Sequence, residues 1–199
     1  MKKIMFNDRY GLTKAVLEGR KTMARRAVPE KLLEAYYDYD DYVCAVAPWD
    51  IPCTREYEEE FFLRRARFEV GEVVAVAQSY EDIVCTELYG DEYVGDKLNL
   101  AGWSNKMFVK ADLMPHRIRI TNVRVERLQD ISDEDCMREG ILEDCPGVQY
   151  SYPTEIGYCG QYPFGTPREA FAALIDKVSG KGTWASNPWV YVYEFQLVK

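Results

Sequence analysis

The spacing of apolar residues predicts strands at both ends and in the middle of the chain. Residues 72–78 (EVVAVAQ) form an apolar, β-branched run, which is typical of a buried strand. Residues 117–127 alternate, although imperfectly, between two sets of side chains, and this favours a second strand. Residues 189–198 (WVYVYEFQLV) predict a closing strand, and residues 4–6 predict a short opening one.

Helix signals stand between these strands. Residues 8–18 carry apolar side chains at helical spacing, and Gly19 is placed to end that helix. Residues 132–140 begin with a Ser-x-x-Asp capping pattern and end in glycine, which predicts a short helix. Residues 166–179 begin Thr-Pro-Arg-Glu, with a capping threonine and a proline in the first turn, and Gly180 ends this helix.

Two segments interrupt the pattern and are expected to be insertions, at about 29–60 and 85–115. The first is rich in tyrosine and acidic residues, so we expect a solvated surface with one short helix near 30–37. Residues 61–68 predict a strand or a bend that leads into a turn. We therefore expect a single domain that spans residues 1–199 and carries both insertions.

The order of these elements indicates an α+β fold. The predicted strands are not regularly paired with crossover helices, so a doubly wound parallel sheet is not expected. A small β-barrel of mixed or antiparallel strands, with short helices at its ends, fits the order best.

The composition is that of a globular protein. The 199 residues are 47% hydrophobic and 14% aromatic. The net charge of -8 argues against a general, high-affinity coat for DNA but leaves room for a local cationic groove. No run of about 20 apolar residues occurs, so no membrane partner is expected. Residues 1–8 are basic but lack the long apolar stretch of a signal peptide, and we expect a cytoplasmic protein.

The cysteines and the histidine form no metal-site pattern. The six cysteines are spread along the chain without a Cys-x-x-Cys pair, and His116 is the single histidine. In a reducing compartment these cysteines are expected to be free thiols. We therefore predict no metal and no cofactor. His116 lies between Pro115 and Arg117 at a strand start, where we do not expect it to serve a nucleophile.

The candidate chemistry begins with a basic run in this acidic chain. Residues 19–26 read Gly-Arg-Lys-Thr-Met-Ala-Arg-Arg and carry four cations in eight residues. A local basic patch on a chain of opposite sign suggests a site for an anionic ligand, and the alternative is a solvated turn after a helix. An extended run would place its side chains alternately on two faces. One face would carry Lys21, Met23 and Arg25, and the other Thr22, Ala24 and Arg26.

Four segments, taken in order, resemble the ASCH-domain family of the PUA-like superfamily. They resemble more closely the phage- and prophage-borne ASCH proteins of bacteria. Residues 15–26 correspond to the signature G-R-K-T-x-T-R-R of those proteins, and residues 184–195 include their closing motif N-P-W-V-x-V-x-E-F. The other segments are residues 70–76 and residues 119–131 with 135–141.

The resemblance implies a PUA-like β-barrel whose cleft binds RNA or a nucleotide-like small molecule. Cations of the basic run would contact phosphates, and a base would stack on Trp103 or on Trp189, unless Trp189 packs in the core. The predicted nucleic-acid-binding residues are Arg20, Lys21, Arg25, Arg26, Trp103 and Lys106.

The resemblance also offers an enzymatic alternative, because one branch of the family hydrolyses the amide of N4-acetylcytidine. That branch uses a lysine of the first motif, a threonine three residues later and a glutamate after the central strand. Lys21 and Glu139 match the lysine and the glutamate, and they are the catalytic residues if this alternative holds. The threonine position is Ala24, whose methyl group cannot attack a carbonyl, so water would have to replace it.

A third hypothesis is an interaction with another protein through residues 38–60. It rests on the Asp, Glu and Tyr residues of this segment. It predicts that deletion of the segment abolishes binding of a partner and leaves the fold intact.

Overall fold

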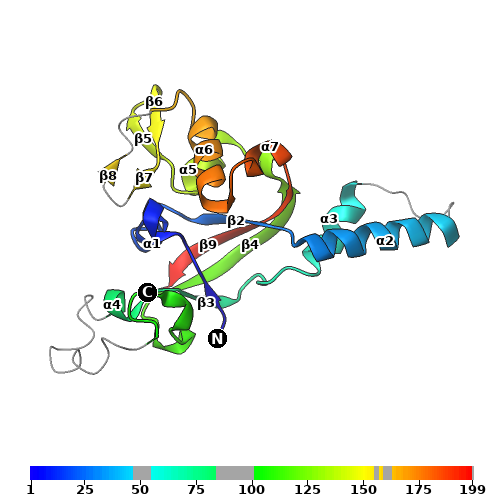
Figure 1. Cartoon of the computed structure of the whole chain (residues 1–199), viewed down its shortest axis with the longest axis horizontal. Helices are drawn as coiled ribbons and strands as arrows, with labels where there is room; N and C mark the ends of the chain where they lie inside the picture. The colour runs from blue at the N-terminus through cyan, green and yellow to red at the C-terminus, as the bar shows by residue number, and fades with distance from the viewer. Residues whose placement is uncertain (47–54, 84–100, 155–156, 159–162, 199) are drawn as a thin grey trace.

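The computed structural model describes residues 1–46, 55–83, 101–154, 157–158 and 163–198. Its centre is a five-stranded mixed sheet with the order β1-β3-β4-β9-β2, in which β1 and β3 are parallel and the other neighbours antiparallel (Figure 1). The strands are β1 Lys3–Ile4, β3 Val73–Val76, β4 Arg117–Arg127, β9 Trp189–Val198 and β2 Met23–Ala27.

The architecture is a mixed α+β fold with short helices around the sheet. This confirms the expected fold class and the long strands over residues 117–127 and 189–198. Within the described residues, no pairing joins the two edge strands β1 and β2, so the sheet is open and a closed barrel is not found. The edges differ in length because β1 spans two residues and β2 spans five.

A bulge in β4 decides which side chains face which side of the sheet. The register against β9 shifts between Ile120 and Asn122, so that Ile120 lies opposite Phe195 and Asn122 opposite Glu194. Neighbouring residues of a strand face opposite sides, so this one-residue shift turns the rest of β4 over. As a result Arg124 lies opposite Val192, on the face of the sheet opposite to that of Phe195.

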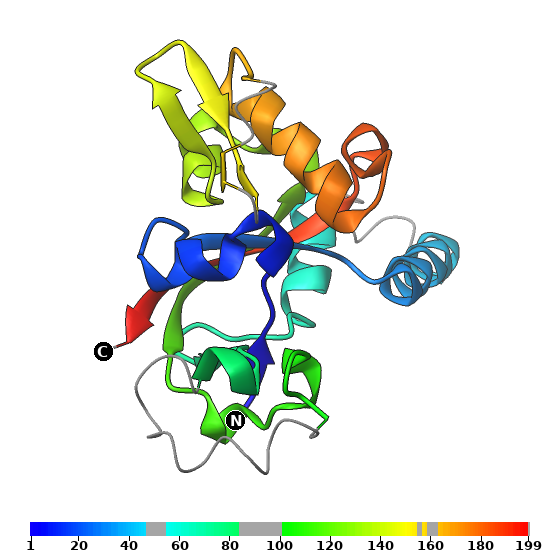
Figure 2. The ribbon, with the colours of Figure 1, turned by 60° about the vertical axis from the view of Figure 1, so that its left-hand side comes forward.

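Four short helices, α1, α5, α6 and α7, lie on one side of the sheet (Figures 1 and 2). The expected capping patterns of α5 and α6 are confirmed. Ser132 Oγ accepts from the Asp135 N–H at 3.1 Å, and Thr166 Oγ1 accepts from the Glu169 N–H at 3.2 Å. The bounds are α1 Leu12–Leu17, after a 3-10 turn at Asp8–Tyr10, α5 Asp133–Arg138, α6 Pro167–Ser179 and α7 Thr183–Ser186.

Short elements complete the described chain. Two hairpins follow α5, built from β5 Leu142–Cys145 with β6 Gln149–Ser151, and β7 Pro153–Thr154 with β8 Gly157–Tyr158. At the β3 end, α4 Tyr80–Ile83 and two 3-10 turns, Lys106–Phe108 and Ala111–Leu113, surround a small second core. About half of the expected insertion at 85–115 lies outside the described residues, since residues 84–100 are not described.

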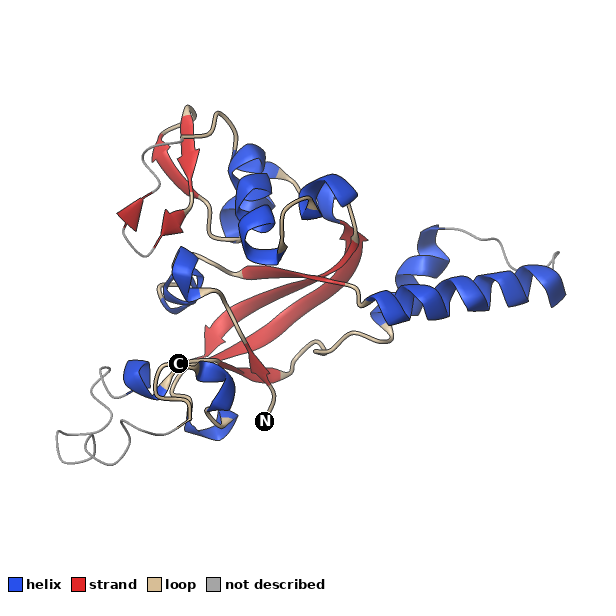
Figure 3. Ribbon diagram, in the orientation of Figure 1, coloured by secondary structure: helices blue, strands red, loops and turns tan. Residues whose placement is uncertain are grey.

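A helical hairpin formed by α2 (Glu30–Val46) and α3 (Arg55–Leu63) projects from the sheet (Figure 3). A helix is present where one was expected near 30–37, but it is longer than expected because it runs on to Val46. Over residues 61–68 the strand alternative is wrong, because α3 continues to Leu63; the expected bend and turn follow it at residues 64–71. Tyr36 packs on Phe62 of the second helix at a ring distance of 5.3 Å, and both are buried. This contact between helices is invisible in the local composition. In the described part of the chain, no helix has the length and apolar character to cross a bilayer.

Candidate functional site

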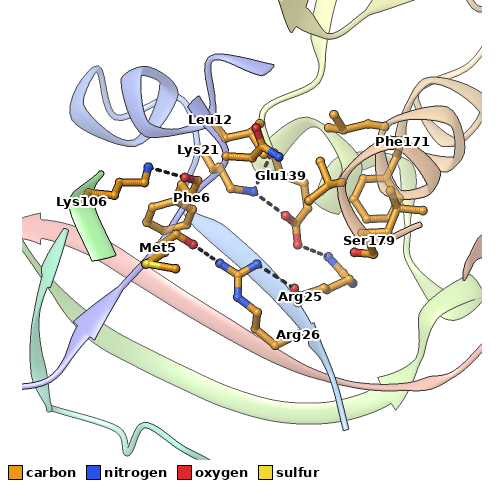
Figure 4. Close-up of a pocket in the computed structure, with 14 residues that line it drawn as sticks. Met5, Phe6, Leu12, Lys21, Arg25, Arg26, Lys106, Glu139, Phe171 and Ser179 are labelled. Atoms are coloured by element: carbon orange, nitrogen blue, oxygen red, sulfur yellow. Dashed lines mark hydrogen bonds and ion pairs between the residues drawn. The ribbon is translucent and has the colours of Figure 1, made fainter. Parts of the chain in front are cut away.

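A cavity of about 290 Å³ lies between the start of the chain, β2, the end of α5 and the apolar face of α6. We call it the Lys21 cavity (Figure 4). Its polar end holds Lys21 and Glu139, and its walls are mainly apolar. The apolar side chains are Met5, Phe6, Leu12, Phe171, Leu174, Ile175 and Val178.

Turns after two helices bring Lys21 and Glu139 together. Helix α1 ends at Leu17, and Gly19 adopts a φ of 73°, as its predicted capping role requires. The Lys21 N–H then donates to the Ala15 carbonyl at 2.9 Å. Gly140, with a φ of 103°, forms the turn after α5 and lies against Lys21, since a Cβ there would be 3.7 Å from that of Lys21.

Lys21 and Glu139 form a buried ion pair. Lys21 Nζ donates to Glu139 Oε2 at 2.5 Å and to the Glu139 backbone carbonyl at 2.6 Å, and the side chains are 4% and 5% exposed. Burial lowers the pKa of the Lys21 ammonium, and the Glu139 carboxylate opposes this effect. The two residues that the sequence analysis paired are thus in contact at one end of a cavity.

Arg25 extends this pair into a larger group of charges. Its guanidinium donates to Glu139 Oε1 at 3.1 Å, to Glu126 Oε1 at 2.6 Å and to Asp135 Oδ2 at 3.1 Å. Its side chain is 1% exposed. The strands explain why Arg25 joins these charges. Arg25 of β2 and Arg124 of β4 both lie opposite Val192 of β9, on the same face of the sheet, and the bulge of β4 determines the face for Arg124.

Ion pairs join eight side chains into what we call the charge network. Arg124 bonds Asp135 and Glu194, and Arg138 bonds Glu194 at 2.7 Å. Within the described part of the chain, the network holds four cations and four carboxylates, so its formal charges cancel. The members are Lys21, Arg25, Arg124, Arg138, Glu126, Asp135, Glu139 and Glu194. Lys21 and Arg25 are therefore compensated inside the protein, and they differ from the open cationic surface that the basic run suggests.

The other predicted cations lie in different surroundings. Arg20 is exposed, bonds Glu18 at 2.7 Å and does not line the cavity. Arg26 lines the cavity and donates to the Met5 carbonyl at 2.5 Å. Lys106 also lines it, where it pairs with Asp8 at 2.7 Å and donates to the Phe6 carbonyl at 2.5 Å.

The predicted aromatic platforms lie away from the Lys21 cavity. Trp103 is half-buried and is absent from the cavity wall. Trp189 is buried, and the Arg127 guanidinium lies 4.4 Å from its ring centre, so it packs in the core. The aromatic rings in the wall are instead Phe6 and Phe171, and the apolar face of the helix over residues 166–179 is the signal that points to Phe171.

Of the residues that the structure describes in the basic run, neither Ala24, at the threonine position of the motif, nor Thr22 supplies a nucleophile to the wall of the Lys21 cavity. Ala24 is 1% exposed, lies opposite Tyr193 and does not line the cavity. Thr22 N donates to the Arg138 carbonyl at 3.0 Å, and its side chain is also outside the cavity wall. Among the described residues that line the cavity, Ser179 carries the only hydroxyl, and it lies at the exposed end of α6.

The described residues contain no group of three or more His, Cys, Asp and Glu side chains arranged to hold a metal ion. Of the cysteines whose side chains the structure describes, Cys136 is buried and Cys145 exposed, and both are free. His116 Nδ1 lies 2.7 Å from Gln78 Oε1 and has no part in the Lys21 cavity.

Comparisons with family models, with curated proteins and with solved structures give no match for this chain. The resemblance to ASCH domains stays a prediction. Interpretation of the Lys21 cavity therefore rests on its own geometry.

That geometry offers a hydrogen-bond donor beside an acceptor. A lysine ammonium has one more N–H than the two Glu139 acceptors occupy. The Glu139 carboxylate keeps lone pairs beyond those used by Lys21 and Arg25. A ligand that carries an acceptor next to a donor can therefore bond both residues at once.

Proposed function

We propose that the Lys21 cavity binds the base of a nucleotide-like ligand or of an RNA nucleotide. The observation that carries the proposal is the pairing of Lys21 and Glu139 at the end of an apolar cavity of about 290 Å³. This volume lies near the lower limit for pockets that hold small molecules. It suits one base with part of its sugar better than a duplex.

Base edges supply the complementary pattern. Cytosine carries an exocyclic amine, which donates, beside a ring nitrogen, which accepts. The amine would donate to Glu139, and the ring nitrogen would accept from Lys21. An N-acyl amide has the same neighbouring N–H and C=O groups. The rings of Phe6 and Phe171 give the base apolar surface on the walls of the cavity.

The same proposal includes the finer fold assignment, an ASCH-type domain of the PUA-like superfamily. The contact between Lys21 and Glu139 supports it, because the resemblance pairs these two positions. The antiparallel β4-β9-β2 arrangement, which unites the central, closing and opening motifs, also supports it.

The direct test compares ligands on the unaltered protein by isothermal titration calorimetry. Cytidine and N4-acetylcytidine should bind, because both keep an N–H on the exocyclic nitrogen. N4,N4-dimethylcytidine lacks that N–H and should bind about tenfold to a hundredfold more weakly, the value of one hydrogen bond to a charged group. Equal affinity for cytidine and its dimethyl analogue would reject base recognition by Glu139.

Variants of the ion pair give a second test. Glu139→Gln and Lys21→Met should each weaken cytidine binding, whereas Arg20→Ala should not, because Arg20 belongs to the same basic run but lies outside the cavity. Circular dichroism on each variant separates lost binding from lost folding. Loss of binding in Arg20→Ala alone would place the ligand elsewhere.

The buried ion pair also favours a second candidate, hydrolysis of an N-acylated nucleoside. Lys21, with its lowered pKa, lies beside a carboxylate that could take a proton from water. The water oxygen would attack the acyl carbon, the C–N bond would break, and the amine would leave with a proton, giving a carboxylic acid and the nucleoside. Ultraviolet spectra of N4-acetylcytidine incubated with the protein test this. An unchanged spectrum, with binding intact, would leave a binding protein.

A further inference from the structure

A second and larger cavity, of about 620 Å³, lies next to the Lys21 cavity. Met5 and Arg26 line both cavities, and the hydrogen bond from Arg26 to the Met5 carbonyl joins the two residues of this common wall (Figure 4). The register of β2 explains the arrangement. Arg26 lies opposite Tyr191, on the face of the sheet opposite to Arg25.

Among the residues that the structure describes, the lining of this second cavity carries four cations and no carboxylate. We call it the basic cavity. Its cations are Lys3, Arg26, Arg65 and Arg67. Among the described residues, none of the four forms an ion pair, in contrast to Lys21 and Arg25. In a chain with a net charge of -8, this concentration of uncompensated positive charge is a local exception.

Two of these cations retain free hydrogen-bond donors. Arg67 is exposed, and its guanidinium lies 5.3 Å from the Phe68 ring centre with no side-chain hydrogen bond to the described residues. The Arg65 guanidinium makes one hydrogen bond to the described residues, to the Phe61 carbonyl at 2.9 Å, and lies 3.8 Å from the centre of the Phe61 ring. Lys3 differs, because it donates to three carbonyls of residues 106–109, so it contributes charge but no free donor.

The aromatic residues of the basic cavity do not oppose an anion. Burial raises the pKa of Tyr191 to about 12 and also raises that of Tyr193, so both phenols stay neutral at physiological pH. Tyr191 donates to the Phe62 carbonyl at 3.0 Å, and Tyr193 accepts from the Arg67 N–H at 3.1 Å, which fixes the wall behind the two arginines.

We propose that the basic cavity is a phosphate-binding site that takes the phosphate of the ligand whose base occupies the Lys21 cavity. Free arginine donors without a competing carboxylate match phosphate oxygens, which accept two N–H bonds from one guanidinium. The shared wall of Met5 and Arg26 places this site next to the Lys21 cavity. The identity of the ligand that carries the phosphate rests on the proposed function, whereas the phosphate site itself rests on the basic cavity alone.

The test compares cytidine, cytidine 5′-monophosphate and the dinucleotide CpC by calorimetry on the full chain. The monophosphate should bind about tenfold more tightly than cytidine, as one added charge-assisted contact predicts. The double change Arg65→Ala with Arg67→Ala should abolish this advantage and leave cytidine affinity unchanged. Arg64→Ala is the matched control, because Arg64 pairs with Glu60 at 2.5 Å and does not line the basic cavity.

The outcomes separate the two proposals. A monophosphate advantage that survives in the double variant overturns the phosphate site and leaves base recognition standing. If the affinity for the monophosphate falls in the double variant but is unchanged by Glu139→Gln, the phosphate site is supported and base recognition is overturned. No binding of any of the three ligands overturns both. Tighter binding of CpC than of the monophosphate would identify an RNA strand as the source of the phosphate, and equal binding a free nucleotide.

Discussion

At the scale of single residues, the most informative finding is that the buried carboxylate of Glu139 forms ion pairs with two buried cations. A carboxylate that bonds both Lys21 and Arg25 cannot be removed without leaving buried positive charge. We predict that Glu139→Ala lowers the free energy of unfolding by about 3–5 kcal/mol. Urea denaturation measures this loss, and Arg20→Ala, at an exposed pair, should stay within about 0.5 kcal/mol of the unaltered protein.

Cys136 gives a prediction about pH. Burial raises the pKa of its thiol from the ordinary thiol value of 9.0 to about 12, and unfolding removes that burial. The folded state then keeps a proton that the unfolded state loses, so Cys136 makes the free energy of unfolding fall as pH rises from about 9 towards 12. In this window the free energy of unfolding of the unaltered protein should fall relative to that of Cys136→Ala. Parallel curves would contradict the assignment.

Thiol reactivity checks the same residue independently. Cys145 is exposed and should react with iodoacetamide in the native protein at pH 8, while buried Cys136 should react only on unfolding. Peptide-resolved mass spectrometry measures both rates in one sample. Equal rates for the two thiols would show that α5 opens freely.

At the scale of elements, α6 forms one wall of the Lys21 cavity and depends on its N-terminal cap. Thr166 Oγ1 accepts from the Glu169 N–H, and the Glu169 carboxylate accepts from the Gly165 N–H at 3.0 Å. Thr166→Ala should lower the free energy of unfolding by about 1 kcal/mol. Thr166→Ser keeps the acceptor and should recover most of that loss in the same denaturation assay.

Elements with strong local signals could be predicted from the sequence, and those that depend on distant partners could not. The β-branched run of β9 and the Thr-Pro start of α6 carry their signals within a few residues, so both were predicted with the observed bounds. The charge network depends on the bulge between Ile120 and Asn122, which decides the face on which Arg124 lies. The imperfect alternation of residues 117–127 predicted a strand but no bulge.

The candidate site divides in the same way. The pairing of Lys21 with Glu139 was expected from the motifs, and the structure places the two in contact. The compensation of Arg25 by Glu126 and Asp135 was not expected. These carboxylates are 101 and 110 residues away in sequence, and no local pattern indicates that they pair with Arg25.

At the scale of the whole molecule, the projecting hairpin of α2 and α3 is joined to the main core through Phe62. This side chain is fully buried, packs 6.0 Å from the Trp189 ring and 5.3 Å from that of Tyr36. Phe62→Ala should lower the free energy of unfolding by about 3–5 kcal/mol, in one cooperative transition. The exposed Tyr42→Ala change is the control, and two separate transitions would mark the hairpin as an independent unit.

The cancellation of formal charge in the network has a consequence for how ionic strength acts. Salt ions screen the electrostatic attraction between an uncompensated charged patch and its ligand. They change this attraction little where opposite charges of the protein already neutralise each other in contact. A nucleoside without phosphate should therefore bind with nearly the same affinity in dilute and concentrated salt. The additional affinity that a phosphate gives should decrease steadily as salt is added. A salt titration alone can therefore tell whether a given ligand binds in the Lys21 cavity or in the basic cavity.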